Sequence, residues 1–451
     1  MANEDLQKMA SNNPAMTAPV SQSIPLEHTQ NRQAHHDIVQ GFDFTGKQEV
    51  NISRKTTSKL TKYDIGWRRV VRNFTPSWFS VTMGTGIVSI LLVSIPFQGS
   101  WLYWLSVAFF GLNAILFSAA FLVSFLRYTL YPEIWRVMIA DSTNSLFLGT
   151  IPMGFATLVE SWMSLCCPYW GPWSVTFAWV CWMIDTVAAV AVTVSLPTLL
   201  MSQSHQQSLD RITAAQLLPV AATIVASGAG AEIAGLLSNP DHALGTLLTS
   251  YVMWGMATPL AMTILVIYYQ RLALHKLPPR EVIVSVFLPL GPLGMGGYTI
   301  LNLGQVASQV FPKVHLFESL QLAGDVAYVL GIFISLIMWG FGLIWFAFAI
   351  ATIYQCRPFP FNMGWWGFTF PLGVYAASTI KFGVIMPSKF FKVLGTIFSV
   401  AVVLLWLVVA AGTARGAWSG QLFYAPCLAN LPKEKIEPME SNIDHERGRD
   451  E

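Results

Sequence analysis

A few ionisable residues lie inside long apolar stretches of this chain, where a charge is costly. Asp185 and Glu232 lie deep in two such stretches, and Lys381 lies near the end of a third. A carboxylate at mid-depth in a membrane must be paired, hydrated or protonated, so both acidic residues are candidates to carry a proton. A structural bond to a neighbouring helix is the alternative for Asp185. Lys381 is a candidate to attract an anion, and a lysine that extends to the lipid headgroups is the alternative.

The sequence carries no signature of an enzyme. It contains no H-E-x-x-H, no Walker A run and no G-x-S-x-G, the patterns of a zinc site, a nucleotide phosphate site and a nucleophilic serine. Its five cysteines form neither a metal-ligand spacing nor a disulfide framework. We therefore expect no catalytic residue, cofactor, metal or nucleic-acid partner. The lack of an ATP site also argues against a primary pump within this chain.

The composition places most of the chain in a lipid bilayer. Hydrophobic residues make up 54% and charged residues 11% of the chain, whereas soluble domains carry about 25% charge. The mean hydropathy is +0.52, and charge is concentrated at the two ends. The sequence therefore predicts a disordered cytosolic tail over 1–72, a membrane domain over 73–414 and a cytosolic tail over 415–451.

Ten apolar segments of the membrane domain are long enough to cross, since a bilayer core needs about 20 residues of helix. They are predicted at 73–95, 101–127, 139–160, 173–200, 213–237, 243–270, 282–310, 322–350, 364–386 and 391–414. Basic residues cluster before the first segment and after the even-numbered ones. The positive-inside rule then places these regions and both termini in the cytosol. We expect no signal peptide, because the first apolar run begins only at Asn73.

Prolines recur at similar intervals in the odd-numbered segments. Pro76, Pro152, Pro219, Pro289 and Pro371 are spaced by roughly 75 residues, enough for two spans and their loops. The recurrence predicts five helical hairpins. A proline within a helix removes a backbone hydrogen bond and kinks the helix, which lipid tolerates only where the freed groups face other helices or water. We therefore expect the odd helices to form an inner layer around a polar pore.

Small and hydroxyl-bearing residues accompany these prolines. Gly84, Thr85 and Gly86 lie in the first span, Ser227 lies in the fifth, and a second proline, Pro292, lies in the seventh. Together with the recurrent prolines, these residues are expected to line the pore. Helix packing is the alternative, because small residues also let helices approach closely.

Several separated motifs within 73–414 resemble one known family. They are M-G-T-G at 83–86, L-G-T-I-P-M-G at 148–154, L-G-P-L-G at 290–294, W-G-F-T-F-P-L-G at 366–373 and V-L-G-T-I at 393–397. The chain resembles the tellurite-resistance and dicarboxylate transporter family, which contains the slow anion channels, and within it the fungal sulfite exporters. The resemblance implies an all-α integral membrane fold of ten helices, arranged as five hairpins in a pseudo-fivefold ring around a central pore. It also implies a homotrimer.

The resemblance further implies a gate and a function. The family closes its pore with a phenylalanine on the ninth helix, and the matching residue is Phe370, beside Pro371. Phe368 is the second choice, and a core aromatic is the alternative. We expect a plasma-membrane transporter that exports sulfite as hydrogen sulfite, either coupled to protons or channel-like. The alternatives are a C4-dicarboxylate carrier or anion channel of the same fold, and a membrane-embedded sensor without flux.

Overall fold

The structure is a computed structural model that describes residues 66–202, 209–316 and 322–430. Ten helices within these ranges are long and apolar enough to cross a membrane, and each overlaps one predicted span. Most of the tail predicted over 1–72 lies outside the described residues, but its last residues form helix α1 (Gly66–Arg72). The predicted C-terminal tail is described only as far as residue 430.

The odd-numbered spans form the inner layer. In each, a short 3₁₀ segment leads into an α-helix: η1 (Pro76–Trp78) into α2 (Phe79–Ser94), η2 (Ser145–Gly149) into α5 (Thr150–Leu165), η4 (Ala214–Gln216) into α8 (Leu217–Leu236), η5 (Arg280–Phe287) into α10 (Leu290–Val310), and η6 (Met363–Phe368) into α12 (Thr369–Ile385). Between 67% and 94% of the most apolar stretch of each inner span is buried, against 11% to 33% in the even spans. The predicted division into inner odd and outer even helices is therefore confirmed.

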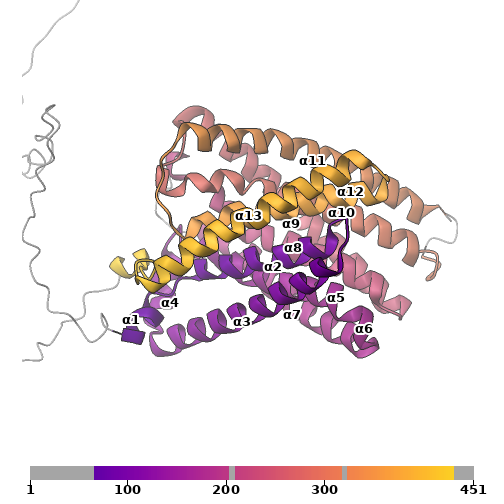
Figure 1. The fold of residues 1–451 in the computed structure, drawn as a ribbon, viewed down its shortest axis with the longest axis horizontal. Coiled ribbons are helices and arrows are strands. Elements are labelled where there is room, and N and C mark those ends of the chain that lie inside the picture. The colour runs from indigo at the N-terminus through magenta and orange to yellow at the C-terminus, as the bar shows by residue number, and fades with distance from the viewer. Residues whose placement is uncertain (1–65, 203–208, 317–321, 431–451) are drawn as a thin grey trace, which may run out of the picture. The chain divides into compact units, whose positions relative to one another are not determined.

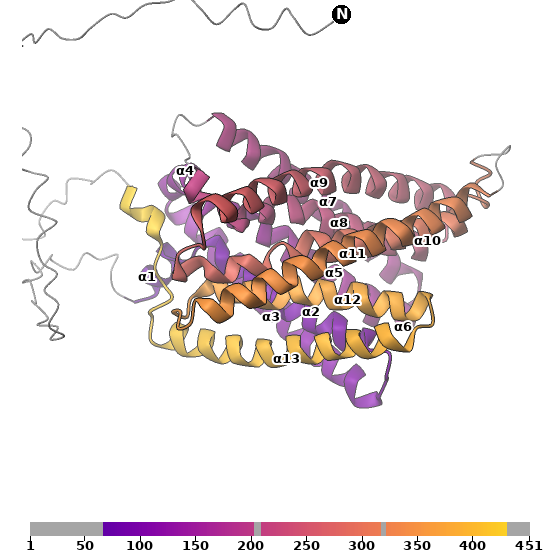
Figure 2. The same cartoon turned by 90° about the horizontal axis from the view of Figure 1, so that it is seen from above.

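The even-numbered spans are longer and form the outer layer. They are α3 (Ser100–Leu130), α7 (Pro172–Ser202), α9 (Pro240–His275), α11 (Ala323–Gln355) and α13 (Lys389–Trp418). Each packs against the inner helix of its own hairpin, and the long helices run along one direction in Figures 1 and 2. The shorter elements at the two ends of the bundle are α4 (Glu133–Ala140), α6 (Cys167–Trp170), η3 (Leu209–Arg211) and η7 (Pro426–Asn430).

The contacts between the inner helices form a closed cycle. Going around it, α2 contacts α5, α5 contacts α8, α8 contacts α10, α10 contacts α12, and α12 contacts α2 again. All five begin at one end of the bundle, which also holds α1 and α4 (Figure 1). We call this end the proximal face and the opposite end, which holds α6, the distal face. A pseudo-fivefold symmetry of the cycle stays a prediction.

Prolines mark the starts of the inner helices. Pro152, Pro219, Pro292 and Pro371 are each the third residue of an α-helix. In the first turn of a helix the backbone N–H has no intrahelical partner, so proline costs little there. The interruption in each of these spans is therefore the junction between the 3₁₀ segment and the α-helix.

This placement corrects the prediction that five recurrent prolines kink the inner helices. Pro76 begins η1, and Pro289 immediately precedes α10. Among the described residues, the prolines in the interior of long α-helices are Pro197 in α7 and Pro259 in α9, both in the outer layer. The recurrence in the sequence thus marks where inner helices begin, because a first-turn proline removes no helical hydrogen bond.

A buried arginine joins distant segments at the proximal face. The Arg127 side chain is fully buried and donates hydrogen bonds to the Phe74 carbonyl oxygen and, at 3.9 Å, to the Cys427 Sγ. Burial raises the pKa of the Cys427 thiol, so the thiol is uncharged at neutral pH. The Ala425 N–H donates to the Asn73 Oδ1 at 3.2 Å. The segment that follows α13 is therefore fixed against the entry to α2.

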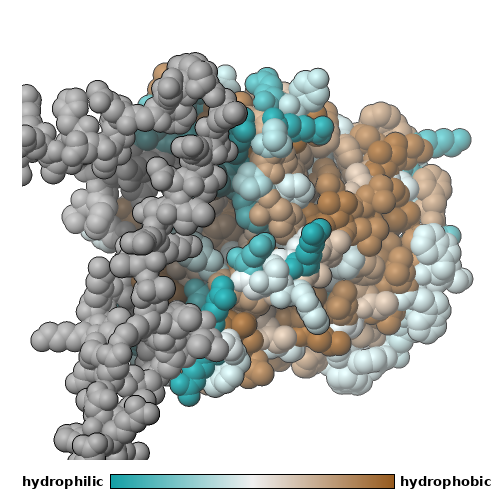
Figure 3. Space-filling view, turned by 60° about the vertical axis from the view of Figure 1, so that its left-hand side comes forward, coloured by the Kyte–Doolittle hydropathy of each residue, from teal (hydrophilic) through white to brown (hydrophobic). Residues whose placement is uncertain are grey.

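The outer helices present an apolar surface. Ile115 of α3, Val187 of α7, Val266 of α9, Ile337 of α11 and Leu404 of α13 are each more than half exposed. Figure 3 shows apolar side chains spread over the flank of the bundle, with hydrophilic ones gathered toward the proximal end. A surface of this kind matches a hydrocarbon environment, so the chain is a multi-pass membrane protein.

Gly294 of α10 is required by a close contact with α12. A Cβ atom at this position would lie 2.8 Å from the backbone N and Cα of Tyr375, and the helix backbone cannot easily move away. Gly294→Ala is therefore expected to destabilise the protein by about 1–3 kcal/mol, measured as a lower melting temperature in detergent. Gly291→Ala on the same helix is the matched control, because the added Cβ would meet no described neighbour within 4 Å. Equal melting temperatures for the two variants would contradict this packing.

Candidate functional site

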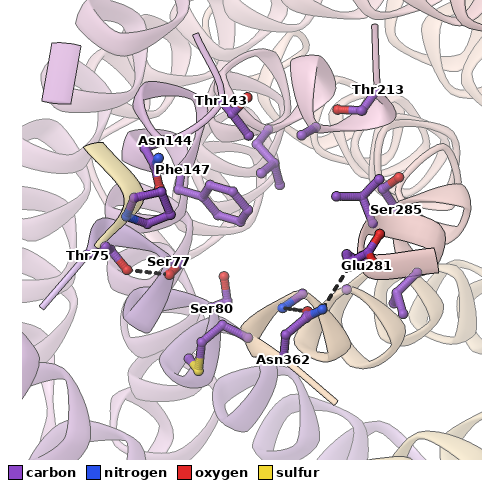
Figure 4. A pocket seen from close by; sticks show the side chains of 18 of the residues that line it. Thr75, Ser77, Ser80, Thr143, Asn144, Phe147, Thr213, Glu281, Ser285 and Asn362 are labelled. Carbon is purple, nitrogen blue, oxygen red and sulfur yellow. Dashed lines mark hydrogen bonds between the residues drawn. The ribbon is translucent and has the colours of Figure 1, made fainter. Parts of the chain in front are cut away.

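The starts of the inner helices surround a cavity of about 380 Å³ at the proximal face. Figure 4 shows the labelled side chains arranged around one opening, with the Phe147 ring extending into it. The side chains with hydroxyl or amide groups that line the cavity are Thr75, Ser77, Ser80, Thr143, Asn144, Thr213, Ser285, Asn362, Gln421 and Tyr424. The cavity is therefore rich in neutral hydrogen-bonding groups.

Four of the polar lining residues immediately precede a 3₁₀ segment. Thr75, Asn144, Thr213 and Asn362 are the N-cap residues of η1, η2, η4 and η6, and all four line the cavity. Such residues are preferred before helices because their side chains can accept a free backbone N–H. Only Asn362 makes this bond, with Gly364 N at 2.8 Å. The Thr75 hydroxyl instead shares a hydrogen bond of 2.7 Å with the Ser77 hydroxyl (Figure 4), and Asn144 and Thr213 make no side-chain cap bond.

The helix starts direct partial positive charge toward the cavity, although its described lining contains no cationic side chain. Backbone dipoles sum to a partial positive charge at a helix N-terminus, and the N–H groups there have no partner within the helix. Because five inner helices begin around the cavity, their positive ends gather at this face. The described lining residues include no lysine or arginine, and the acidic one among them is Glu281. This arrangement can hold a small anion.

Phe370 lies about one helical turn beyond the cavity. The lining contributed by this span ends at Gly367, and Phe370, the second residue of α12, is buried with 4% of its surface exposed. Phe368 instead packs edge-on against Phe287, with 5.0 Å between the ring centroids, and against Trp365 at 5.7 Å. Phe368 thus belongs to an aromatic cluster, whereas Phe370 follows the last cavity-lining residue of its span by three positions.

Four residues predicted to line the pore lie instead at contacts between helices. The Thr85 hydroxyl accepts a hydrogen bond from Trp406 Nε1 of α13 at 3.1 Å, and the Ser227 hydroxyl donates to a carbonyl oxygen of α9 at 2.6 Å. Gly84 and Gly86 face side chains of α12 and α5 too closely to accept a Cβ. These contacts favour the helix-packing alternative, because small residues let neighbouring helices approach, and a pore-lining role for the four residues stays a prediction.

The predicted prolines border the cavity without lining it. Pro219 and Pro289 each follow a residue that lines it, and Pro152, Pro292 and Pro371 are buried. Their contribution is therefore to begin the helices whose starts form the wall. The polar residues that do line the wall were missed by the sequence reasoning, although a threonine or asparagine before an apolar span is a usable N-cap signal.

A second polar group lies among the inner helices toward the distal face. The Tyr298 hydroxyl of α10 donates to Glu232 Oε1 of α8 at 2.7 Å. Lys381 of α12 and Glu160 of α5 both interact electrostatically with Glu232. Asn302 of α10 is buried, and its Nδ2 has no hydrogen-bond partner of normal geometry among the described residues. We call these five residues the distal cluster.

Asp185 reaches the same region from the outer layer. It is on α7, is only 2% exposed, and neither of its carboxylate oxygens has a hydrogen-bond partner among the described residues. It interacts electrostatically with Glu160. Glu232, Lys381 and Asp185 were each candidates from the sequence, but the sequence did not predict that they lie close together in space. It also left Glu160 and Tyr298 out of the site, although an acidic residue in the third span was a usable signal.

These features define the class of the protein: a multi-pass α-helical membrane protein whose inner helices begin around a polar cavity. Comparison with known families then supplies the particular group. The family model SLAC1, described as voltage-dependent anion channel, matches residues 73–414. The chain belongs to this family.

Named relatives are similar over most of their length. The protein called Sulfite efflux pump SSU1 in Arthroderma benhamiae is 48% identical over 353 residues, which cover 78% of this chain and 93% of the relative. The protein of the same name in Candida albicans is 28% identical over 354 residues, 74% of this chain and 72% of the relative. The Malic acid transport protein of Schizosaccharomyces pombe is 26% identical over 373 residues, 78% of this chain and 81% of the relative.

Cysteine labelling can test the geometry of the cavity. Thr213 lines the cavity and is partly exposed, so Thr213→Cys in detergent-solubilised protein is expected to react readily with an anionic methanethiosulfonate reagent. Thr85→Cys is the matched control, because the Thr85 side chain is buried against α13. The labelling rate of each variant is read above the background of the native cysteines. Equal rates for the two variants would exclude the cavity as drawn in Figure 4.

Proposed function

We propose that the protein is a plasma-membrane transporter that exports sulfite from the cytosol, as hydrogen sulfite, and so detoxifies it. The observation that carries this proposal is the 48% identity to a relative named Sulfite efflux pump SSU1, over 93% of that relative. The cavity supports it, because neutral donors and helix starts offer hydrogen bonds and partial positive charge to a small oxyanion. Weak attraction of this kind also lets an anion leave again, as transport requires.

A C4-dicarboxylate such as malate is the second candidate substrate. It is favoured by the relative named Malic acid transport protein, which is 26% identical. A dicarboxylate has two separated charges and would be expected to use charge-assisted contacts to both. The described lining residues of the cavity include no lysine or arginine, so the lining suits a small monovalent anion better. The third candidate, a sensor without flux, has no observation that favours it.

The proposed direction of transport depends on the orientation of the bundle. We assign the proximal face, with both termini, to the cytosol under the positive-inside rule. The arginines near that face that support the assignment are Arg68, Arg69 and Arg72 of α1, Arg136 of α4 and Arg415 near the end of α13. In this orientation the cavity opens to the cytosol and receives the anion that is to be exported.

Phe370 is the proposed gate. It lies between two polar regions, the proximal cavity and the distal cluster, and is about 16 Å from Lys381 along the axis of α12. Its apolar ring would interrupt the hydrated path between them. A change of its side-chain rotamer would open the path without moving the helix.

Two further features belong to the proposal. Coupling to protons would use Glu232 or Asp185, and Glu232 is better placed because it is partly exposed on an inner helix, whereas Asp185 is buried on an outer one. A homotrimer is implied by the family resemblance. The mass of the purified complex, corrected for bound detergent, would test it.

Flux from proteoliposomes tests the function. Vesicles that contain the purified protein are loaded in parallel with sulfite and with malate, with and without a pH gradient. Efflux of sulfite without efflux of malate is the expected result. Efflux of malate alone would indicate a C4-dicarboxylate transporter, and binding without any flux would favour the sensor. Protein-free vesicles give the passive leak, which matters because protonated sulfur species cross lipid unaided.

Phe370→Ala is expected to raise the sulfite leak by about tenfold or more, because it removes the apolar barrier next to the cavity, worth at least ~1.4 kcal/mol. The rate is measured in the same vesicles without a pH gradient. Phe368→Ala is the matched control: it removes a ring from the aromatic cluster, so it should lower the melting temperature and leave the leak unchanged. A Phe370→Ala protein that folds normally and leaks no more than the parent would sink the gate assignment.

A further inference from the structure

The distal cluster combines both signs of charge with an unused hydrogen-bond donor. Its side chains come from four of the five inner helices: α5, α8, α10 and α12. Glu232, Tyr298 and Lys381 keep partial exposure. Asn302 is 4% exposed, and its Nδ2 lacks a partner of normal geometry. A buried amide donor beside the hydroxyl of Tyr298 is the kind of group that a ligand oxygen would satisfy.

The charges in the cluster make anion binding depend on a proton. With Glu232 ionised, its negative charge neutralises Lys381, and a second carboxylate, Glu160, lies close by. An oxyanion would then be repelled. When a proton is added to the Glu232 carboxylate, the positive charge of Lys381 becomes available to an anion. Proton binding and anion binding at this place therefore favour each other, which is linkage in the thermodynamic sense.

We propose that the distal cluster is a binding site for one small oxyanion together with one proton. The proton resides on a carboxylate oxygen of Glu232, whose neighbour Glu160 can share it, and the anion accepts hydrogen bonds from Lys381 Nζ and Asn302 Nδ2. No covalent bond forms or breaks. This inference rests on the proposed export function and deepens it: hydrogen sulfite would meet a proton-linked site after passing Phe370, before release at the distal face.

Other titratable side chains lie around the distal cluster. Asp185 of α7 faces it and interacts with Glu160, and α2 contributes no titratable side chain. Toward the distal ends of the helices packed around the cluster, the other titratable residues are Tyr103 of α3, Cys181 of α7, Asp241, His242 and Tyr251 of α9, Asp325 and Tyr328 of α11, and Lys389 and Lys392 of α13. The electrostatic interactions of the cluster residues do not include them. The pH dependence is therefore assigned to Glu232, with Glu160 and Asp185 as its neighbours.

The test compares variants in proteoliposomes over a range from about pH 5 to about pH 8, where a buried carboxyl group can titrate. Sulfite titrates in this range as well, so each variant is compared with the parent at the same pH. Glu232→Gln keeps an oxygen that accepts a hydrogen bond from the Tyr298 hydroxyl. It is expected to remove the part of the pH dependence of sulfite efflux that comes from the protein, and to leave the part that comes from the titration of sulfite. Asp241→Asn removes an exposed carboxylate near the distal face and should retain the parental profile.

At low pH, where Glu232 carries its proton, Lys381→Gln is expected to weaken sulfite binding by about tenfold or more, because a charge-assisted contact is lost, and Lys381→Arg should restore most of it. If Glu232→Gln keeps the parental pH profile, or if Lys381→Gln binds sulfite as the parent does, the site is overturned. The melting temperature of each variant in detergent, without ligand, shows whether it has folded.

A second readout separates this site from the export function. Methanesulfonate keeps a single negative charge over the whole pH range, so its effect on the melting temperature reports the state of the protein alone. The parent should be stabilised more at low pH than at high pH, and Glu232→Gln should show no such difference. If the parent moves no sulfite but shows this pattern, the site stands and the export function falls. If methanesulfonate stabilises the parent equally at every pH, or not at all, the proton-linked site falls whatever the flux.

Discussion

Backbone polar groups inside a membrane must find hydrogen-bond partners. The inner layer of this protein depends on how the free N–H groups at the starts of its helices find theirs. The first N–H groups of a helix have no intrahelical partner, and lipid offers none. Here the five starts lie together at the proximal face, around a cavity lined by hydroxyl and amide groups. The first-turn prolines remove some of the free N–H groups outright. The polarity of the cavity follows from this arrangement.

The same arrangement supplies positive potential at low cost. A lysine or arginine at the centre of the bundle would have to be removed from water, whereas helix dipoles are part of the backbone and are already oriented. Lys381, a lysine on an inner helix, is accompanied by Glu232 and Glu160. In the proposed function, helix dipoles would attract an anion near one face, whereas Lys381, Glu232 and Glu160 lie together among the inner helices nearer the other. Along α12, the buried Phe370 lies between Gly367, the last cavity-lining residue of its span, and Lys381.

Much of the fold could be predicted, and less of the site. The ten spans and their two layers were predictable because apolar length and the positions of Pro and Gly are local properties. The prolines were found correctly but interpreted as kinks, since the boundary between a 3₁₀ segment and an α-helix is not visible in composition. Thr85 and Ser227 were expected to face a pore, yet each bonds to an outer helix. A hydroxyl in a helix does not reveal which neighbour it will meet.

The sequence by itself determined that the chain is a ten-span membrane protein and which family it belongs to. Burial in lipid demands long apolar segments, which are visible in the sequence. The family motifs within 73–414 are runs of consecutive residues, so they can be recognised without the structure. Only the tertiary structure decided which side chains meet. Trp406 and Thr85 are 321 residues apart, and Tyr298 and Glu232 are 66 residues apart. The physical reason is that the direction of a side chain is fixed by its helix, but its partner is fixed by the rotation and depth at which the helices pack.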